Sequence, residues 1–557
     1  MLLKKRRSVG HIIFSGLVLF LLLDMAVSSC TPHGQRNSKY RVIHNNDGTD
    51  ALGNFWFHKR PLSVADLNAY VDTVAHSQVT TFMMCSGSDY PYYRSKYSRL
   101  FCDDQNGKYD CGSDTATYNF FRKFYLNFLN LEKEGTDLIT ASLKRAKEDG
   151  MEAFITYRMN DLHFNDTTTH CPLLYSTFWY SHPEYWINDS TPGWNASRAL
   201  DFAHKEVRDH KLEMISEQLD KYGDVIDGYD LDFMRFIVYF KMGEGRKNAP
   251  LMTQLVKDIR AKADAVSARR GKKILLSVRV PPTIEACLDK GLDIQEWLRQ
   301  GLVDFVSIGV HWRGNTSLPV AKFIKDLGRD DIPVYASIDD GGFRPRETYS
   351  HGMLRGMASH ILSQGADGLY LFNQYYGEYN STYNGHIHLE DGGQVCRVIA
   401  PLLLQEMGSL ETLKNRNKIY CLCDDSSDAY GVVVDSPLPM QVDGDKASEA
   451  AIYIGDDPKE TVPEESILFF RLNRETGCEI SVNGQKLTEE EPSYPHLYDR
   501  EKGLAPGEKE YAFRIPATCL KQGNNIVSFR SLNGEKIMVK RVDVALKYGD
   551  VQTHGYF

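Results

Sequence analysis

The chain has 557 residues, which is more than one ordinary globular core holds, so we expect one large domain and at least one smaller one. Hydrophobic residues make up 42% of the sequence and charged residues 25%, a composition that excludes a disordered or fibrous protein. The net charge of -9 and the pI near 6.0, with no concentrated run of Lys and Arg beyond the N-terminus, argue against a nucleic-acid partner.

The first 30 residues have the pattern of an export signal. Basic residues 4–7 precede the apolar stretch Ile12–Leu23, which is too short for a comfortable membrane span. Val27-Ser28-Ser29-Cys30 follows and resembles the lipobox of bacterial lipoproteins, in which the cysteine is lipid-modified. We therefore expect a signal peptide over residues 1–30 and an exported protein, on the periplasmic or cell-surface side, whose contact with the membrane is the lipid on Cys30. Ordinary cleavage with Cys30 as an incidental thiol, or an uncleaved anchor, are the alternatives.

Ten cysteines remain without Cys30, an even number that suits an oxidising compartment. Cys102 and Cys111 are close enough in sequence to close one loop. The sequence has no CxxC pair, so we expect no structural zinc.

Residues from about 40 to 410 alternate between apolar strand-like runs and amphipathic helix patterns, the rhythm of parallel strands joined by crossover helices. A further helix is expected from Val395 to Glu406. Eight strand-helix repeats predict an α/β fold, with a (β/α)8 TIM barrel over residues 31–410. An open doubly wound sheet is the alternative, but no Gly-rich phosphate turn follows the first strand. The expected strands are Arg41–His44, Val79–Cys85, Glu152–Arg158, Gly228–Met234, Ile274–Val280, Phe305–Val310, Val334–Ile338 and Gly368–Phe372.

Two long insertions follow the second and third expected strands, Ser86–Gly135 and Asp161–His204. Both fall where the βα loops of a barrel form the mouth of an active site. Sugar rings present flat C–H faces that stack on aromatic side chains, so the aromatic residues of these loops are candidates to line a glycan cleft; for each, packing beneath a loop is the alternative. They are Tyr90, Tyr92, Tyr93, Phe178, Trp179, Tyr180, Tyr185, Trp186 and Trp194, together with Trp312 further along.

After about residue 415 the pattern changes to short alternating strands separated by turn residues. We expect a small C-terminal β-sandwich domain over residues 411–557. Residues 513–525 resemble the edge motif of jelly-roll accessory domains that are common in secreted glycosidases. Such a domain either binds glycan or buttresses the barrel.

The segment with the most chemical content is Asp227–Phe236 on the fourth expected strand. Strand side chains alternate, so Asp230 and Asp232 share one face, and two carboxylates inside an apolar strand are costly unless they serve a site or are paired. Asp232 lies nearer the carboxyl end of the strand, where barrel enzymes keep their chemistry. The alternative is a structural ion pair with one of the nearby arginines, Arg158, Arg235 or Arg279.

Several strand-end motifs together resemble the glycoside-hydrolase-like barrels related to the α-amylase superfamily, many of them found in bacterial lipoproteins. These motifs span most of the expected barrel, and the resemblance implies a reaction class more than a substrate. They are residues 157–163, Asp227–Arg235, residues 277–281, residues 301–305 and residues 365–373.

By position, this resemblance implies Asp232 as nucleophile, Glu285 as acid/base, and Asp339 or Asp340 as a stabilising carboxylate, with Asp230 as a further catalytic candidate. Glu285 lies a few residues past its strand and could instead cap or salt-bridge the next helix. The sequence lacks the Arg-x-Asp spacing of true amylases, which argues against starch-like substrates.

Polar residues at the other strand ends are candidates to bind sugar hydroxyls, or a sulfate or carboxylate on an acidic glycan. A metal-dependent hydrolase is the alternative suggested by His386-Ile387-His388, but no ligand series continues it, and we expect neither a metal nor a cofactor. The substrate-binding candidates are Arg158, Asn160, Asp161, His163, Arg235, Arg279, His311, Trp312 and Asn373.

The sequence thus predicts a glycoside hydrolase that acts on an oligo- or polysaccharide through paired carboxylates at the C-terminal end of the barrel. A non-catalytic glycan-binding surface lipoprotein is the alternative. A polysaccharide lyase with Tyr157 or His163 as base is a third hypothesis.

Overall fold

A computed structural model describes most of the chain from Tyr40 onward, and the statements below refer to these residues. They are 40–52, 60–166, 170–310, 318–339, 351–373, 375–376, 398–399, 403–422, 436–444, 446–488 and 505–549.

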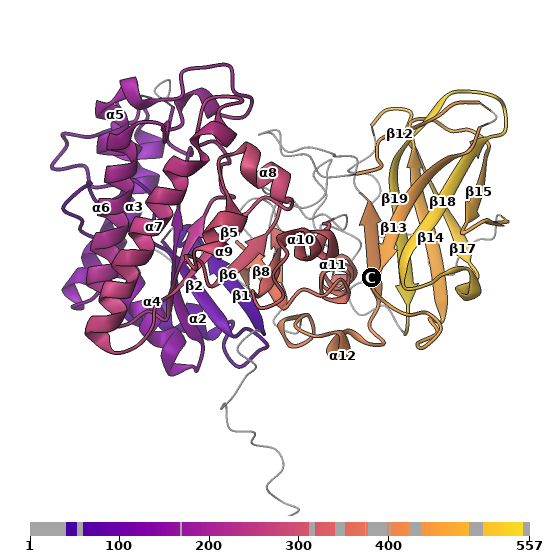
Figure 1. Ribbon diagram of the computed structural model, residues 1–557, viewed down its shortest axis with the longest axis horizontal. Coiled ribbons are helices and arrows are strands. Elements are labelled where there is room, and N and C mark those ends of the chain that lie inside the picture. Colours follow the sequence, from indigo (N-terminus) through magenta and orange to yellow (C-terminus); the bar gives the residue numbers. More distant parts are fainter. Residues whose placement is uncertain are drawn as a thin grey trace, which may run out of the picture. The chain divides into compact units, whose positions relative to one another are not determined.

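Eight parallel strands form a closed barrel in chain order, with β1 hydrogen-bonded to both β2 and β8 (Figure 1). Each expected strand is present, which confirms the (β/α)8 barrel. The burial of nearly every strand residue explains the continuous apolar runs in the sequence, because helices cover the outer face of such a sheet. The strands are β1 Arg41–Asn46, β2 Thr81–Cys85, β3 Glu152–Arg158, β4 Gly228–Asp232, β5 Leu275–Val280, β6 Phe305–Ile308, β7 Val334–Asp339 and β8 Gly368–Phe372.

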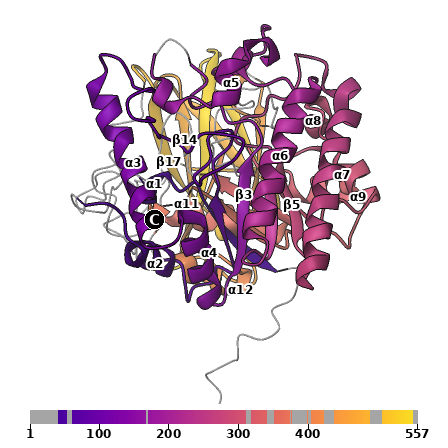
Figure 2. The same ribbon diagram turned by 90° about the vertical axis from the view of Figure 1, so that its left-hand side faces the viewer.

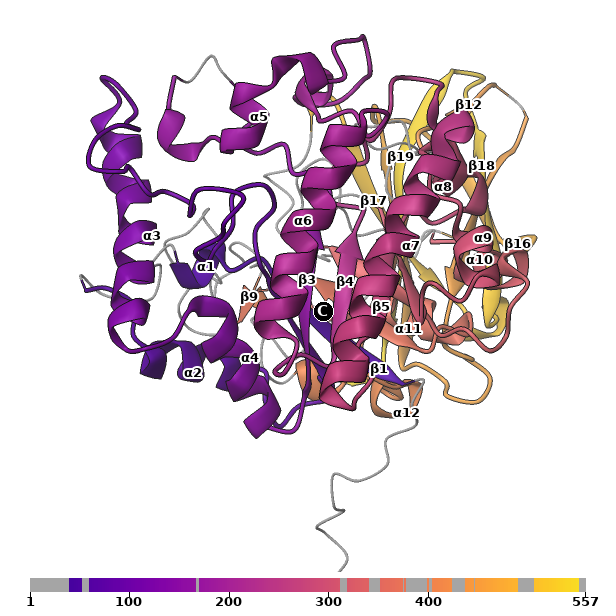
Figure 3. The ribbon, with the colours of Figure 1, turned by 60° about the vertical axis from the view of Figure 1, so that its left-hand side comes forward.

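The helices between these strands pack around the barrel, and neighbouring helices lie side by side, as α2 and α4 do in Figure 2 and α6 and α7 in Figure 3. None of the described helices is both long enough and apolar enough to cross a membrane. The helices are α1 Thr49–Leu52, α2 Val64–Asp72, α3 Thr115–Lys133, α4 Leu138–Glu148, α5 Thr177–Ser181, α6 Lys205–Tyr222, α7 Gly245–Arg270, α8 Ile284–Asp289, α9 Ile294–Arg299, α10 Val320–Leu327, α11 His351–Ser363 and α12 Leu410–Leu413.

The helix expected over residues 395–406 does not form in the described part of that segment. Val398–Ile399 is instead a short strand, β10, which pairs with β9 at Tyr375–Tyr376, and Leu403–Gln405 is a single 3-10 turn. Pro401 lies inside the expected helix, and proline removes a backbone donor and clashes with the preceding turn.

A disulfide joins the two insertions that follow β2 and β3. Cys111 bonds to Cys171 and not to Cys102, which is a buried free thiol, so the loop closure expected from sequence was wrong. The guanidinium of Arg99, in the first insertion, donates to the carbonyl oxygens of Pro172 at 2.8 Å and Tyr175 at 3.0 Å in the second. These long-range contacts bring the two insertions together, whereas spacing along the chain favoured the nearer cysteine.

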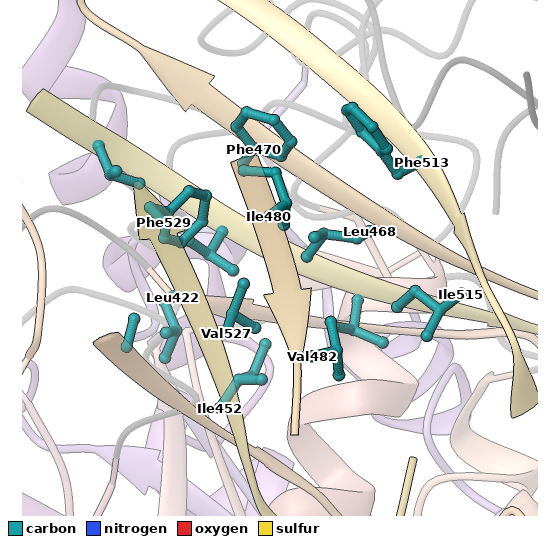
Figure 4. Close-up of a cluster of buried hydrophobic side chains, with 14 of the residues drawn as sticks. Leu422, Ile452, Leu468, Phe470, Ile480, Val482, Phe513, Ile515, Val527 and Phe529 are labelled. Carbon is teal, nitrogen blue, oxygen red and sulfur yellow. The ribbon is translucent and has the colours of Figure 1, made fainter. Parts of the chain in front are cut away.

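The C-terminal region is a β-sandwich, as the sequence predicts. One sheet has the order β11-β19-β14-β17, with β12 also paired to β19, and the other has the order β13-β18-β15-β16. Their facing side chains form one apolar core, which includes Leu468, Phe470, Ile480, Val527 and Phe529 (Figure 4). The strands are β11 Lys418–Leu422, β12 Met440–Val442, β13 Ser448–Ile454, β14 Glu465–Leu472, β15 Cys478–Val482, β16 Gln485–Lys486, β17 Lys509–Ile515, β18 Gly523–Ser531 and β19 Ile537–Lys547.

Helix α11 of the barrel packs directly against strand β11 of the sandwich. A Cβ atom on Gly356 of α11 would lie only 2.0 Å from the carbonyl oxygen of Ile419, so this close approach requires glycine. Beside it, the Tyr420 hydroxyl lies 3.0 Å from the Ser359 hydroxyl and 2.9 Å from the Asp456 carboxylate. Asp456 also accepts a hydrogen bond from Lys418 at 2.9 Å. The seam therefore combines tight packing with a buried polar network.

Gly356→Ala is expected to lower the free energy of unfolding by about 1–3 kcal/mol, because the added methyl group overlaps a backbone oxygen that cannot rotate away. Urea unfolding followed by circular dichroism measures this change. Gly477→Ala is the matched control, since its Cβ would meet its nearest neighbour at an ordinary 3.5 Å. Equal stability of the two variants would contradict the close packing of this seam.

Candidate active site

The register of the barrel places the polar residues of β3, β4 and β5 in layers inside the barrel. Asp230 lies opposite Thr156 on β3 and Ser277 on β5, and accepts hydrogen bonds from both hydroxyls, at 3.0 and 2.6 Å. The Tyr370 hydroxyl of β8 donates to the same carboxyl group at 3.2 Å. Burial and the neighbouring charge of Asp232 raise the pKa of Asp230 to about 6. A buried carboxyl group that titrates near neutral pH thus lies in the barrel interior.

The next layer, at the carboxyl end of the strands, contains an ion-paired triad of two aspartates and one arginine. Arg279 on β5 binds Asp232 on β4 through Nε at 2.9 Å and through Nη2 at 3.1 Å. Its Nη1 atom binds Asp339, the last residue of β7, at 3.0 Å. All three side chains are about 1% exposed. The ring of Phe372 lies 3.7 Å from the guanidinium carbon of Arg279.

This triad is tightly held by its surroundings. The backbone N–H of Met234 donates to Asp232 at 2.9 Å, and the Ser337 hydroxyl donates to Asp339. Burial opposes the charge of Arg279, but the two carboxylates outweigh burial and raise the pKa of Arg279 above its ordinary value. Asp230 and Asp232 therefore share the interior face of β4, as strand alternation predicts, and Asp232 has Arg279 as its partner among the arginines considered.

A second buried charge cluster lies beside the triad, at the ends of β1 and β3. Arg158 binds Asp161 at 3.0 Å and lies 3.4 Å from Asp47, which follows β1. Asn373, after β8, donates to Asp47 at 3.1 Å. Although burial opposes ionisation of Asp161, the hydrogen bond from His163 and the charge of Arg158 lower its pKa well below the ordinary value.

His163 connects this cluster to Arg235. Its Nδ1 lies 2.6 Å from Asp161 and its Nε2 lies 2.7 Å from Nη2 of Arg235. Arginine can only donate, so Nε2 must be the acceptor and Nδ1 must carry the proton. Burial lowers the pKa of His163, which favours the same neutral form.

Three buried side-chain atoms of this region have no hydrogen-bond partner among the described residues. They are Nη2 of Arg158, whose ion pair with Asp47 at 3.4 Å is longer than a good hydrogen bond, Nε of Arg235 and Oδ1 of Asn373. An unsatisfied buried polar atom costs about 1–3 kcal/mol. Polar groups of a ligand bound at this end of the barrel would satisfy these atoms.

Other residues expected at the site lie elsewhere. The side-chain amide of Asn160 donates to the carbonyl oxygens of Leu200 at 3.0 Å and Val238 at 2.6 Å, and so fastens two loops. Glu285 lies in the first turn of α8, with its side chain 77% exposed and bound to Arg246. Glu285 is thus salt-bridged to α7, the helix that precedes β5, and not to the helix that follows it. His311, Trp312 and Asp340 lie outside the described residues.

The structure also adds residues that the sequence did not single out. Asp47 directly follows Asn45 and Asn46 at the end of β1, and this polar run at a strand end was the available signal. Lys211 on α6 is fully buried and binds Asp89 with both contacts at 2.7 Å. Lys211 gave no signal in sequence, because its helix face becomes buried only when the insertion after β2 folds over it.

Among the described residues, no group of three or more His, Cys, Asp and Glu side chains could hold a metal ion. The described charged side chains at the mouth of the barrel are instead carboxylates that form ion pairs with guanidinium groups.

Comparison with known proteins finds no matching family model and no matching curated protein. Solved structures with a similar fold include a noncanonic maltogenic α-amylase, AmyB, from Thermotoga neapolitana, with 9% identity over 92% of this chain and 100% of that one, and a TM-score of 0.36. SrfJ from Salmonella typhimurium has 11% identity over 88% of this chain and 90% of that one, with a TM-score of 0.34.

A cycloisomaltooligosaccharide glucanotransferase from Paenibacillus sp., solved with cycloisomaltoheptaose, has 10% identity over 91% of this chain and a TM-score of 0.33. The present chain spans 58% of that protein. With identities near 10% and TM-scores below 0.5, these likenesses identify neither a family nor an activity.

The raised pKa of Asp230 has a consequence for stability. The native state holds this proton more tightly than the unfolded chain, so the contribution of Asp230 is fully present below about pH 4 and is lost as the pH rises through 6. The difference in unfolding free energy between the parent protein and Asp230→Asn is therefore expected to fall between pH 4.5 and 7, by an amount on the order of 2 kcal/mol. Urea unfolding at four pH values measures it, and a pH-independent difference would rule out the proton on Asp230.

Proposed function

We propose that this protein is a glycoside hydrolase in which Asp232 is the nucleophile. The observation that carries the proposal is the buried triad of Asp232, Arg279 and Asp339 at the carboxyl ends of the barrel strands, where barrel enzymes keep their chemistry. One guanidinium touches both carboxylates at 3.0 Å or less, which leaves them close enough for a two-carboxylate mechanism, whose separations are about 5 to 9.5 Å.

The charge of the triad favours glycosidic bond cleavage. Two carboxylates and one guanidinium give it a net charge of -1, and the transition state of glycoside hydrolysis carries positive charge on the sugar ring. Fixed negative charge in a water-poor site stabilises such a transition state. In this proposal Asp232 attacks the anomeric carbon while the glycosidic C–O bond breaks, and the leaving oxygen takes a proton from water. A second water molecule then cleaves the bond between Asp232 and the sugar, and Asp339 stabilises the positive charge that develops in both steps. Glu285 does not enter it, because its carboxylate is exposed and bound to Arg246.

The lyase hypothesis loses support from the same geometry. Tyr157 is fully buried with its ring 5.7 Å from the ammonium nitrogen of Lys211, and burial raises its pKa well above the ordinary value. The Nε2 lone pair of His163 is used by Arg235. Neither group can readily take a proton from a sugar.

A non-catalytic glycan-binding protein is the competing function. It is favoured by the complete pairing of Asp232, whose two oxygens both bind Arg279. A binding protein needs no nucleophile, so the two functions differ in what the loss of the Asp232 carboxylate does.

Asp232→Asn is expected to lower kcat by at least about a thousandfold, because the substitution removes the attacking oxygen while keeping the size of the side chain. Release of reducing sugar from a panel of plant, algal and host glycans, by protein beginning after Cys30, measures it. Retained near-ultraviolet circular dichroism shows that the variant is folded. If no glycan is cleaved by the parent protein and both proteins bind one glycan equally, the binding function replaces the hydrolase.

We further propose export and lipid anchoring through Cys30, on the basis of the basic, apolar and lipobox segments that precede it. Cys30→Ser is expected to abolish incorporation of radiolabelled palmitate into the protein expressed in a bacterium, and to move it from the membrane fraction to the soluble fraction. Cys519→Ser is the control, because that buried thiol lies in the sandwich. Equal labelling of both variants would contradict a lipid on Cys30.

A further inference from the structure

Trp194 is an exposed indole in the insertion that follows β3. Its exposed fraction is 52%, whereas Trp179 and Trp297 are fully buried and Trp186 is half-buried. Leaving a large aromatic side chain in water forgoes about 25 cal/mol for each Å² that burial would cover. The fold thus buries or half-buries the other tryptophans of the described chain and leaves this one at the surface.

The backbone that carries Trp194 is firmly held. The indole rings of Trp179 and Trp186 stack at 4.6 Å, and Nε1 of Trp179 donates to the carbonyl oxygen of Arg198 at 2.8 Å. Asn188 donates its backbone N–H to Ser197 at 2.8 Å, which closes the loop around Trp194. The side chain of Asn195 donates to Leu162 at 3.3 Å, next to His163. The loop is a fixed support for the exposed ring.

Trp194 is linked to the triad by a short series of ring contacts. Its ring centre lies 6.1 Å from that of His163 and 5.9 Å from that of Phe236. The guanidinium of Arg235 lies over Phe236 at 5.3 Å and over Phe372 at 5.6 Å. Phe372 in turn packs against Arg279, the partner of Asp232. Trp194 therefore lies at the rim of the same site, beyond Arg235.

The loop that carries Trp194 also lines a cavity. Thr191 and Pro192, just before Trp194, line a cavity of about 230 Å³ together with residues 237–243, which follow the Asp232 strand. The rim next to β4 thus has a fixed, exposed aromatic ring and a cavity that is lined by residues of the same loop.

The charges of the site indicate which kind of sugar it takes. Among the described residues of the site, four carboxylates (Asp47, Asp161, Asp232 and Asp339) face three guanidinium groups (Arg158, Arg235 and Arg279), which gives a net charge of -1 with His163 neutral. An anionic sugar would add repulsion at such a site, whereas a neutral pyranose would not.

We propose that Trp194 is the stacking platform of a sugar-binding subsite at the barrel rim, and that its ligand is a neutral pyranose unit of the glycan chain. The subsite rests on the proposed function in that it would hold a sugar of the same chain that reaches Asp232. The flat C–H face of the pyranose lies on the indole, and the ring hydroxyls face the polar rim.

The test measures binding without turnover, by titration calorimetry in the Asp232→Asn full-length protein. The probes are cellohexaose, maltoheptaose, chitohexaose and, as the anionic comparison, hexagalacturonic acid. Trp194→Ala is expected to weaken binding of a neutral probe about five- to tenfold, because the stacking contact is lost, whereas Trp194→Phe is expected to stay within about twofold. Tyr97→Ala is the matched control, since Tyr97 is 42% exposed in the insertion that follows β2 and is not among the candidate cleft residues.

Three results would overturn the proposal. They are equal affinity of Trp194→Ala and its parent, the same loss in Tyr97→Ala, and binding of hexagalacturonic acid alone or of no probe at all. Turnover by the protein with Asp232 intact is measured separately. Trp194-dependent binding without any turnover would support the subsite and reject the hydrolase. Turnover that Trp194→Ala leaves unchanged would support the hydrolase and reject the subsite.

Discussion

The buried contact of Arg279 with Asp232 and Asp339 is the interaction on which the rest of the site depends. Taking two carboxylates out of water inside the barrel is costly, and one guanidinium compensates both while joining β4, β5 and β7. Removing one partner from such a buried group typically costs about 3–5 kcal/mol. The same contact that makes the layer stable therefore fixes the orientation of the proposed nucleophile and gives the site its net negative charge.

Around this triad the barrel arranges a second set of charges whose partners come from different strands. Arg158 on β3 is ion-paired with Asp47 after β1. His163 lies between Asp161 and Arg235 and is hydrogen-bonded to both. These groups lie just outside the apolar and hydroxyl layers that contain Asp230 and Tyr370. A site built this way is held by rigid strands, and the Cys111–Cys171 disulfide joins the two insertions that follow β2 and β3.

The contacts between the sandwich and the barrel are tightly packed and buried, like those of a protein core. The backbone approach at Gly356 and the Asp456 network tie α11 to β11. Since α11 follows β7, which carries Asp339, and precedes β8, which carries Phe372, the contacts of α11 connect the sandwich to one strand of the triad and to the strand of the ring that packs against it. Buttressing of the barrel is thus a physical role that these contacts already explain.

The sequence by itself determined the eight strands and the shared face of Asp230 and Asp232, because strand alternation and apolar runs are local properties of the chain. It could not choose among Arg158, Arg235 and Arg279 as the partner of Asp232, nor between a site and a surface position for Glu285. Barrel register places both Arg158 and Arg279 opposite Asp232, and the side-chain ion pairs decided the first: Arg279 binds Asp232, whereas Arg158 binds Asp161. The start of α8 after the Thr283 cap decided the second by turning Glu285 toward Arg246. Both depend on residues distant in sequence, and such contacts exist only once the barrel closes.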